Sequence, residues 1–137
     1  MQGREFLELA RELLASGTAP RHWRAVIIHA YYALFLECRE AMSRWGLPPL
    51  PRLQAHSEVR LRLTYSSDSD LKEIGNKLER LGKRRNWASY DLQSLPVFAS
   101  PAQARQDVKD ATTALALLDA IDADPARRAA AVASIPP

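Results

Sequence analysis

The chain has 137 residues, of which 47% are hydrophobic and 26% are charged. This length fits one domain, and this composition is typical of a folded globular chain and not of a disordered one. The single cysteine excludes an intramolecular disulfide and a cysteine-rich metal site. The formal net charge of +3 is mildly basic, so it permits a phosphate-bearing partner without requiring one.

The first third of the chain predicts two helices. Apolar residues recur at helical spacing at Phe6, Leu9, Ala10, Leu13 and Leu14. Gly17 is expected to end this helix in a left-handed conformation, and Pro20 fits the first turn of the next one. The second helix has a wide apolar stripe, which predicts a central position in a bundle. Its members are Trp23, Val26, Ile27, Ala30, Tyr31, Leu34, Phe35, Cys38, Ala41, Met42 and Trp45. Gly46 and the prolines after it end the helix.

The rest of the chain predicts three further helices. A short one covers about residues 53 to 63, and Asp70 with Glu73 resembles a capping box for a fourth. The apolar positions of the fourth helix are Leu71, Ile74, Leu78 and Leu81. Residues 91–99 are expected to form a loop, after which Ser100, Pro101 and Gln103 suit the start of a fifth helix. Its stripe is Ala104, Val108, Ala111, Leu115, Leu118 and Ile121.

Helices joined by short loops pack antiparallel, so the chain predicts an all-α, antiparallel four-to-five-helix bundle over residues 1–123. Residues 124–137, rich in Ala, Arg and Pro, are expected to form a flexible tail. No apolar run approaches the ~20 residues of a membrane span, and the N-terminus lacks a signal-peptide layout. We therefore expect a cytoplasmic location without membrane association. No metal-ligand spacing and no glycine-rich phosphate loop is present, so no metal and no cofactor are expected.

Three segments, in order, carry a family resemblance. Residues 24–35 read RAVIIHAYYALF, His56 opens a helix in AHSEV, and residues 84–91 read RRNWASYD after a helical segment that begins at Leu71. Together they resemble the HEPN domain superfamily, the nucleotide-binding domain of higher eukaryotes and prokaryotes. Many prokaryotic members have an "A…AYYA.F" helix, often a histidine at the start of a following helix, and later an arginine followed by "x-x-A-D-Y". The likeness covers roughly residues 4 to 121.

The resemblance implies a helical bundle that commonly dimerises and associates with RNA or nucleotides. Family members include metal-independent endoribonucleases, toxins paired with nucleotidyltransferase antitoxins, and non-catalytic modules of defence systems. In the family's ribonuclease signature, four to six residues separate the arginine from a following histidine. Here the windows after Arg84 and Arg85 contain Ser89, Tyr90, Asp91 and Leu92, and no histidine.

Two functions follow as expectations. The first is an RNA- or nucleotide-associated protein of a toxin–antitoxin or phage-defence system, with weak metal-independent endoribonuclease activity. The second is a catalytically silent interaction module that dimerises or docks on a nucleotidyltransferase or a larger defence effector. The absent histidine favours the second. A homodimer is expected in both cases, because a wide aromatic stripe in so small a bundle is expected to be buried partly between subunits.

The candidate site residues surround the later arginine pair. Arg85 suits phosphate, because a guanidinium can grip two phosphate oxygens at once. A histidine suits proton transfer, because its pKa lies near neutrality, and His56 is the candidate from another helix. Tyr90 is a second catalytic candidate, although its ordinary pKa near 10 makes it a poor base. The candidates for binding RNA or phosphate are Arg80, Lys83, Arg84 and Asn86.

Each candidate also has a structural interpretation. Cations at residues 80–85 lie near a helix C-terminus, where each interacts favourably with the helix dipole by about 0.3–1 kcal/mol. Tyr90 fits a core or interface tyrosine, and Trp87 either stacks on a base or packs against the end of the bundle. His29 and Cys38 fit buried positions on the central helix.

Overall fold

The computed structural model describes all residues from Met1 to Pro137. It contains six α-helices, two short 3-10 helices, Arg52–Gln54 and Pro96–Phe98, and no strand, which confirms the all-α prediction. The α-helices are α1 (Arg4–Ser16), α2 (Pro20–Arg44), α3 (Ala55–Thr64), α4 (Ser69–Tyr90), α5 (Ala102–Ala123) and α6 (Pro125–Ala133). None of them carries an apolar stretch long enough to cross a membrane.

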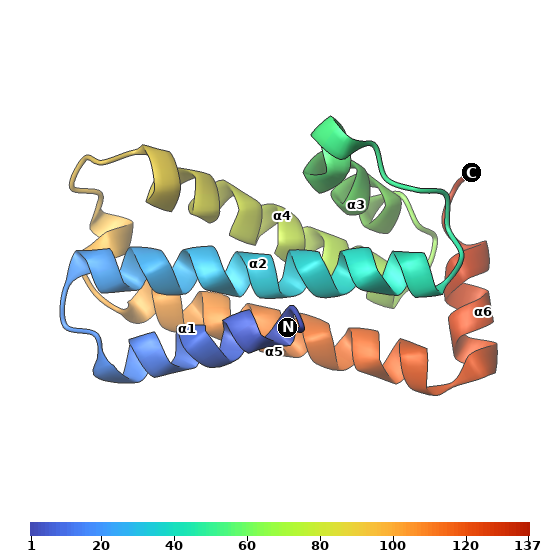
Figure 1. Ribbon diagram of the computed structural model, residues 1–137, viewed down its shortest axis with the longest axis horizontal. Helices are drawn as coiled ribbons and strands as arrows, with labels where there is room; N and C mark the ends of the chain where they lie inside the picture. Colours follow the sequence, from blue (N-terminus) through green and yellow to red (C-terminus); the bar gives the residue numbers. More distant parts are fainter.

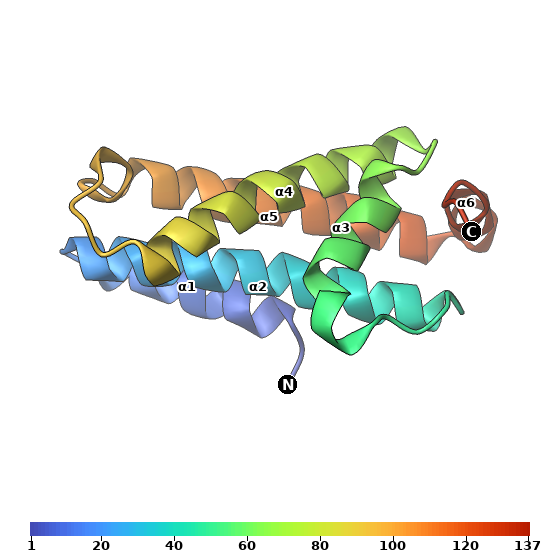
Figure 2. The same cartoon turned by 90° about the horizontal axis from the view of Figure 1, so that it is seen from above.

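Four helices form the body of the bundle. In Figure 1, α1, α2, α4 and α5 run along the long axis, and α1 with α2, α2 with α4, and α4 with α5 are antiparallel. Figure 2 shows α3 crossing from the side of α2 to the side of α4, while α6 lies across one end of the bundle. The predicted antiparallel bundle is present, and α6 takes the number of helices beyond the expected five.

The core is organised around α2, as its wide apolar stripe predicted. Twelve residues of α2 are buried, among them Val26, Ile27, Ala30 and Leu34 with no exposed surface. The predicted apolar stripes of α4 and α5 are buried as well, at every position that the sequence pattern named. Complete burial of a large aliphatic side chain contributes roughly 1.5–3 kcal/mol, so these periodic positions account for the arrangement of the long helices.

The two glycines that end the first helices behave differently. Gly17 is extended, with φ −70° and ψ 151°, so the left-handed ending predicted for α1 is wrong. A Cβ at Gly17 would lie 2.6 Å from the carbonyl oxygen of Leu13 and 2.7 Å from Cβ of His22, so close packing explains this glycine. Gly46 has φ +74°, which favours glycine, and ends α2 as expected.

The starts of α4 and α5 also differ from the predicted caps. Asp68 caps α4, because its carboxylate accepts hydrogen bonds from the backbone N–H groups of Asp70 and Leu71. The predicted cap, Asp70, lies inside the helix. In α5 the helix begins after Pro101, and the Gln103 amide donates to Asp107 at 2.9 Å instead of closing a capping box.

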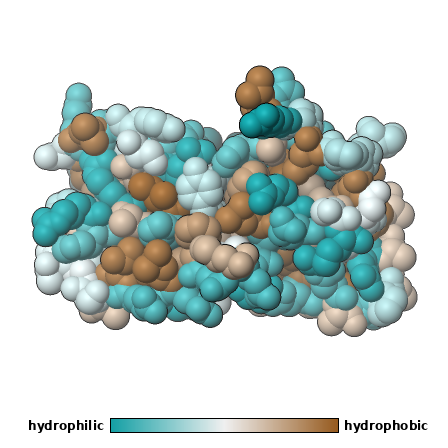
Figure 3. All heavy atoms as spheres, viewed as in Figure 1, coloured by the Kyte–Doolittle hydropathy of each residue, from teal (hydrophilic) through white to brown (hydrophobic).

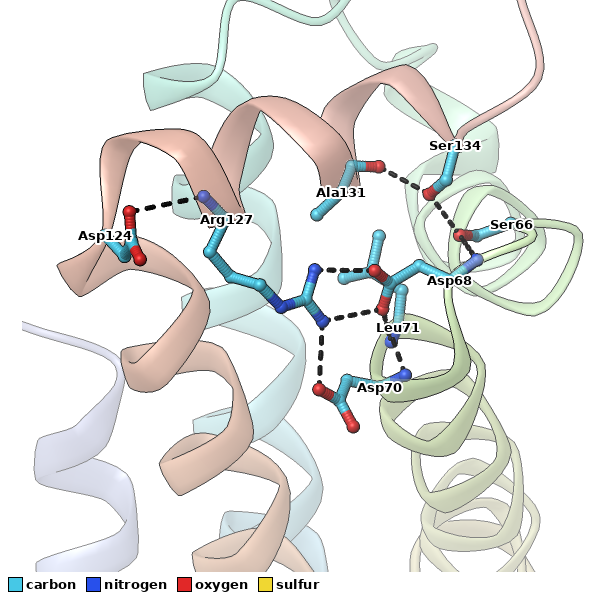
Figure 4. Close-up of polar contacts among 8 residues, drawn as sticks. All are labelled: Ser66, Asp68, Asp70, Leu71, Asp124, Arg127, Ala131 and Ser134. Atoms are coloured by element: carbon cyan, nitrogen blue, oxygen red, sulfur yellow. Dashed lines mark hydrogen bonds and ion pairs between the residues drawn. The ribbon is translucent and has the colours of Figure 1, made fainter.

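The C-terminal residues form α6 in place of the flexible tail that their composition suggested. Asp124 caps α6 and Pro125 occupies its first turn. Figure 4 shows the Arg127 guanidinium donating to both carboxylate oxygens of Asp68, at 2.6 and 3.0 Å, and to Asp70 at 2.9 Å. The Ser134 hydroxyl lies 2.6 Å from that of Ser66, and Ile135 is buried. The tail is thus fastened to the start of α4.

Candidate functional site

A cleft of about 330 Å³ lies where α2, α3 and α4 meet. In Figure 1, α3 diverges from the C-terminal part of α4, and Figure 3, seen from the same side, shows an indentation in the upper outline of the molecule. The lining residues come from all three helices: Tyr31, His56, Ser57, Arg60, Leu78, Glu79, Gly82, Lys83, Arg85 and Asn86. Three of them are permanent cations and one is a carboxylate, so the cleft favours an anion.

The floor of the cleft is formed by Tyr31 and Gly82. Tyr31 is buried, with 4% of its surface exposed, and its ring is stacked on Phe35 with centroids 5.9 Å apart. A Cβ at Gly82 would lie 3.4 Å from Cε2 of Tyr31. A larger side chain at position 82 would therefore stand on the tyrosine ring and occupy the cleft.

His56, in the first turn of α3, forms one wall. Its ring is parallel to that of Phe35, with centroids 4.0 Å apart, and Nδ1 lies 2.6 Å from the hydroxyl oxygen of Tyr31. Partial burial, followed by the charges of Arg85 and Arg39, lowers the pKa of His56 below its ordinary value of 6.5. The ring is therefore neutral near pH 7, and Nε2 has no hydrogen-bond partner within the protein.

Arg85 enters the cleft from α4. Its guanidinium carbon lies 4.9 Å from the ring centroid of Tyr31 and 5.6 Å from that of Tyr32. Arg85 is half-buried, forms no ion pair, and its Nε is buried without a hydrogen-bond partner. Buried cations are normally paired, so this guanidinium retains unused capacity to donate to an anion. Burial raises the pKa of Tyr31, and the hydrogen bond and the charge of Arg85 act against that rise.

Arg84 faces the other way. Its Nε lies 2.8 Å from both carboxylate oxygens of Asp107, a fully buried residue of α5, and its terminal nitrogen lies 4.0 Å from Asp110. Burial raises the pKa of Asp107, while the charge and hydrogen bonds of Arg84 act against the rise. Arg84 therefore links α4 to α5, and its positive charge is neutralised by an ion pair within the protein.

Of the remaining predicted site residues, some line the cleft and others lie outside it. Lys83 and Asn86 line the cleft, and Lys83 also lies 3.9 Å from Glu79 at the surface. Arg80 is exposed outside the cleft. Tyr90, on the last turn of α4, is also not among the lining residues and is 77% exposed, so it is not a core residue. The structure therefore brings His56, Lys83, Arg85 and Asn86 together, and leaves out Arg80, Arg84 and Tyr90.

Three contributors were missed by sequence reasoning. Tyr31 belongs to the apolar stripe of α2 and is buried, but its hydroxyl also lies 2.6 Å from Nδ1 of His56. Arg60 adds a cation without an ion-pair partner to the cleft. Arg24 lies with its guanidinium 4.2 Å from the Phe98 ring centroid and donates to the carbonyls of Ala88 and Gln93 at 3.2 and 2.8 Å. The AYYA pattern is the only sequence feature that points to a role for Tyr31. No local pattern indicates a role for Arg60 or Arg24.

Arg24 holds the end of the helix that carries Arg85. The last carbonyl groups of an α-helix lack intrahelical partners, and a guanidinium that donates to several of them satisfies them together. Besides Ala88 and Gln93, the same guanidinium donates to the carbonyls of Trp87 and Asp91. The backbone beyond Arg85 is therefore fixed against α2.

His29 lies outside the cleft. Its ring is stacked on Phe6 with centroids 5.6 Å apart, and its Nδ1 is buried without a hydrogen-bond partner. Burial lowers the pKa of His29, so the ring is neutral near pH 7. Nowhere in the chain do three or more His, Cys, Asp or Glu side chains lie together as metal ligands would.

No family model, curated protein or solved structure matches the chain. The HEPN resemblance therefore depends on the three sequence segments described above and stays a prediction. The chemistry of the cleft is independent of that resemblance. It combines a cation with free hydrogen-bond donors, a neutral imidazole and a tyrosine hydroxyl, which together can bind a phosphate group and move a proton beside it.

Proposed function

We propose that this protein is a HEPN-type, metal-independent endoribonuclease that binds RNA through a phosphate in the cleft. One observation carries the proposal: half-buried Arg85 has no carboxylate partner and shares its cleft with the neutral ring of His56. The adjacent Arg84 is neutralised by Asp107, so the unpaired state of Arg85 is a property of that position and not of the basic cluster as a whole. The three HEPN-like segments support the same function.

The proposed reaction is attack of a ribose 2′-hydroxyl on the neighbouring phosphorus. A base removes the proton of the 2′-hydroxyl as the new oxygen–phosphorus bond forms, and the bond to the 5′-oxygen of the next nucleotide breaks. That oxygen takes a proton from solvent as it leaves, and the base later releases to solvent the proton that it accepted, which gives a 2′,3′-cyclic phosphate and a 5′-hydroxyl. Arg85 stabilises the charge that develops on the phosphate oxygens, as preorganised donors do in phosphoryl transfer. Lys83 and Asn86 add donors at the rim of the cleft.

His56 supplies the base in this scheme. A base at Nε2 requires the proton of the neutral ring to be on Nδ1, where it donates to the hydroxyl oxygen of Tyr31. Tyr31 keeps its own proton because its pKa is raised. The hydrogen bond then holds the ring orientation and supports the positive charge that the imidazole acquires. The histidine missing after Arg85 in the sequence is replaced, on this account, by one from α3.

The test is cleavage of a mixed pool of labelled RNAs in EDTA, with wild type, Arg85→Ala and a matched control, Arg105→Ala. Arg105 is an exposed arginine of α5 outside the cleft, without an ion pair, so its loss changes the net charge equally. Cuts that leave cyclic-phosphate ends, are lost in Arg85→Ala and persist in Arg105→Ala are expected. Equal cleavage by all three proteins would refute the assignment of the cleft.

The biological setting proposed for this activity is a toxin–antitoxin or phage-defence system, in which ribonucleases of the HEPN family act.

We also propose that the protein acts as a homodimer. Two exposed leucines outside the cleft, Leu53 before α3 and Leu92 after α4, give it apolar surface that a second copy can cover. Light scattering at micromolar concentration tests the dimer: a mass near twice that of the 15.3 kDa chain is expected, and the mass of one chain would contradict it.

A second candidate function is a catalytically silent module that docks on a nucleotidyltransferase or a larger effector. The specific observation in its favour is the absence of a following histidine separated from Arg84 or Arg85 by four to six residues. In that case Arg85 pairs with a phosphate-bearing nucleotide or with a partner's carboxylate, and no RNA is cut. A partner retained at high salt without RNA, together with no cleavage at high protein concentration, would favour this module over the ribonuclease.

A further inference from the structure

The last turn of α4 presents two large aromatic side chains to solvent just beyond the cleft. Trp87 is 49% exposed and Tyr90 is 77% exposed. Neither the indole N–H of Trp87 nor the hydroxyl of Tyr90 has a hydrogen-bond partner in the protein, and neither ring stacks on another aromatic side chain. Core residues would be buried and bonded, so packing does not explain these side chains.

Their helical positions connect both rings to the cleft. Residues four apart on a helix are neighbours on one face, which makes Tyr90 the neighbour of Asn86 and Trp87 the neighbour of Lys83. Asn86 and Lys83 both line the cleft. Each aromatic ring is thus one helical turn, roughly 6 Å along the axis, beyond a residue that faces the proposed phosphate.

This surface is held in place. Arg24 donates to the backbone carbonyls of Trp87, Ala88 and Asp91, so the end of α4 is anchored to α2 and the rings extend from a fixed backbone. A platform that binds by stacking gains from such rigidity, because less conformational freedom is lost when the ligand arrives.

We propose that Trp87 and Tyr90 form a base-binding subsite for an unpaired nucleotide next to the phosphate held at Arg85. The subsite rests on the proposed function, and it adds a requirement that the cleft alone does not impose. A base inside a duplex has both faces covered by its neighbours, whereas an unpaired base can stack on an aromatic ring. Since larger bases stack more strongly, a purine is preferred at this nucleotide.

The test is binding of labelled oligonucleotides whose 2′-hydroxyls are all methylated, so that no cleavage interferes. Wild type, Tyr90→Ala, Trp87→Ala and Arg85→Ala are compared by fluorescence anisotropy on a single-stranded adenosine hexamer and on a duplex of the same length. Tyr65→Ala is the matched control, because Tyr65 is 70% exposed and lies outside the cleft at the end of α3. Circular dichroism verifies that each variant is helical.

The subsite predicts that Tyr90→Ala and Trp87→Ala each weaken single-strand binding by about 5- to 150-fold. Trp87→Phe restores most of the affinity, Tyr65→Ala binds as wild type does, and the duplex binds more weakly than the single strand. If Arg85→Ala abolishes binding while both aromatic variants bind normally, the subsite is refuted and the phosphate cleft stands. Equal affinity for duplex and single strand also refutes the subsite. If wild type binds neither oligonucleotide, the proposed function fails and the subsite fails with it.

Discussion

The hydroxyl oxygen of Tyr31 lies 2.6 Å from Nδ1 of His56, and this contact joins the central helix of the bundle to the first turn of α3. The two residues are 25 positions apart in the sequence. Because the contact occupies Nδ1, it leaves Nε2 as the ring nitrogen that can act on a ligand. It also orients the imidazole toward a cleft that already contains an unpaired arginine.

Replacement of His56 by alanine should reduce the rate of cleavage and leave binding nearly intact. General acid–base help contributes about 100- to 10,000-fold, so His56→Ala is expected to slow single-turnover cleavage by a factor in that range. Tyr31→Phe keeps the stacking and removes only the hydroxyl, so its effect should be smaller. Quenched-flow or manual single-turnover assays measure the rate, and anisotropy with methylated RNA measures the affinity. An unchanged rate in His56→Ala would remove His56 from the mechanism.

The cleavage rate should depend on pH through His56. The pKa of His56 is lowered from 6.5, and the neutral ring is the active base, so the rate is constant above the ordinary pKa. It then falls as the pH drops through the lowered value, which puts the acidic limb of the profile below pH 6.5. Rates measured from pH 4.5 to 8 in one buffer series test this. A limb centred above pH 7 would point to a different group.

Replacement of the two neighbouring arginines should change the free energy of unfolding by very different amounts. Arg84→Ala leaves the fully buried carboxylate of Asp107 without its cation, which is expected to cost about 3–5 kcal/mol of unfolding free energy. Arg85→Ala removes a half-buried cation that has no carboxylate, so the change should lie within about 1 kcal/mol and can be stabilising. Urea unfolding followed by circular dichroism measures both. A large loss in Arg85→Ala would mean that Arg85 is structural.

The attachment of α6 should depend on Arg127 and on pH. Arg127 and the backbone N–H groups of the α4 start lower the pKa of Asp68 below its ordinary 3.8, despite some burial. Its stabilising contribution is therefore present above pH 3.8 and is lost as the pH falls through the lowered value. Arg127→Ala should accelerate amide hydrogen exchange in residues 125–135 and leave the middle of α4 protected. Unchanged exchange in α6 would show that its apolar contacts hold it without the ion pair.

The architecture followed from periodicity. The apolar stripes of α2, α4 and α5 are determined by which residues repeat at helical spacing, so Leu71, Ile74, Leu78 and Leu81 could be placed in the core from local pattern alone. α6 was missed because Asp124 and Pro125 end one helix and start the next. The same dipeptide fits both roles, and only the contact of Arg127 with Asp68, 59 residues away, distinguishes them.

The site could be predicted only in part, because its chemistry depends on contacts between distant segments. Arg84 and Arg85 are adjacent and chemically identical, but Asp107 of α5 neutralises one and leaves the other free. His56 was singled out by its position at a helix start, yet its closeness to Arg85 depends on how α3 crosses the bundle. Tyr90 follows Arg85 by five residues and lies beyond the lining of the cleft, because the last turn of α4 carries it past Asn86.

A double-mutant cycle on cleavage tests whether Arg85 and His56 act on one phosphate in one cleft. Single-turnover rates in EDTA are measured for wild type, Arg85→Ala, His56→Ala and the double variant. Slow cleavage is expected in both single variants. The double variant should be much less impaired than the product of the two effects, because the effects of residues that act as a unit are not additive. Fully multiplicative effects, or a wild-type rate in either single variant, would contradict this joint action.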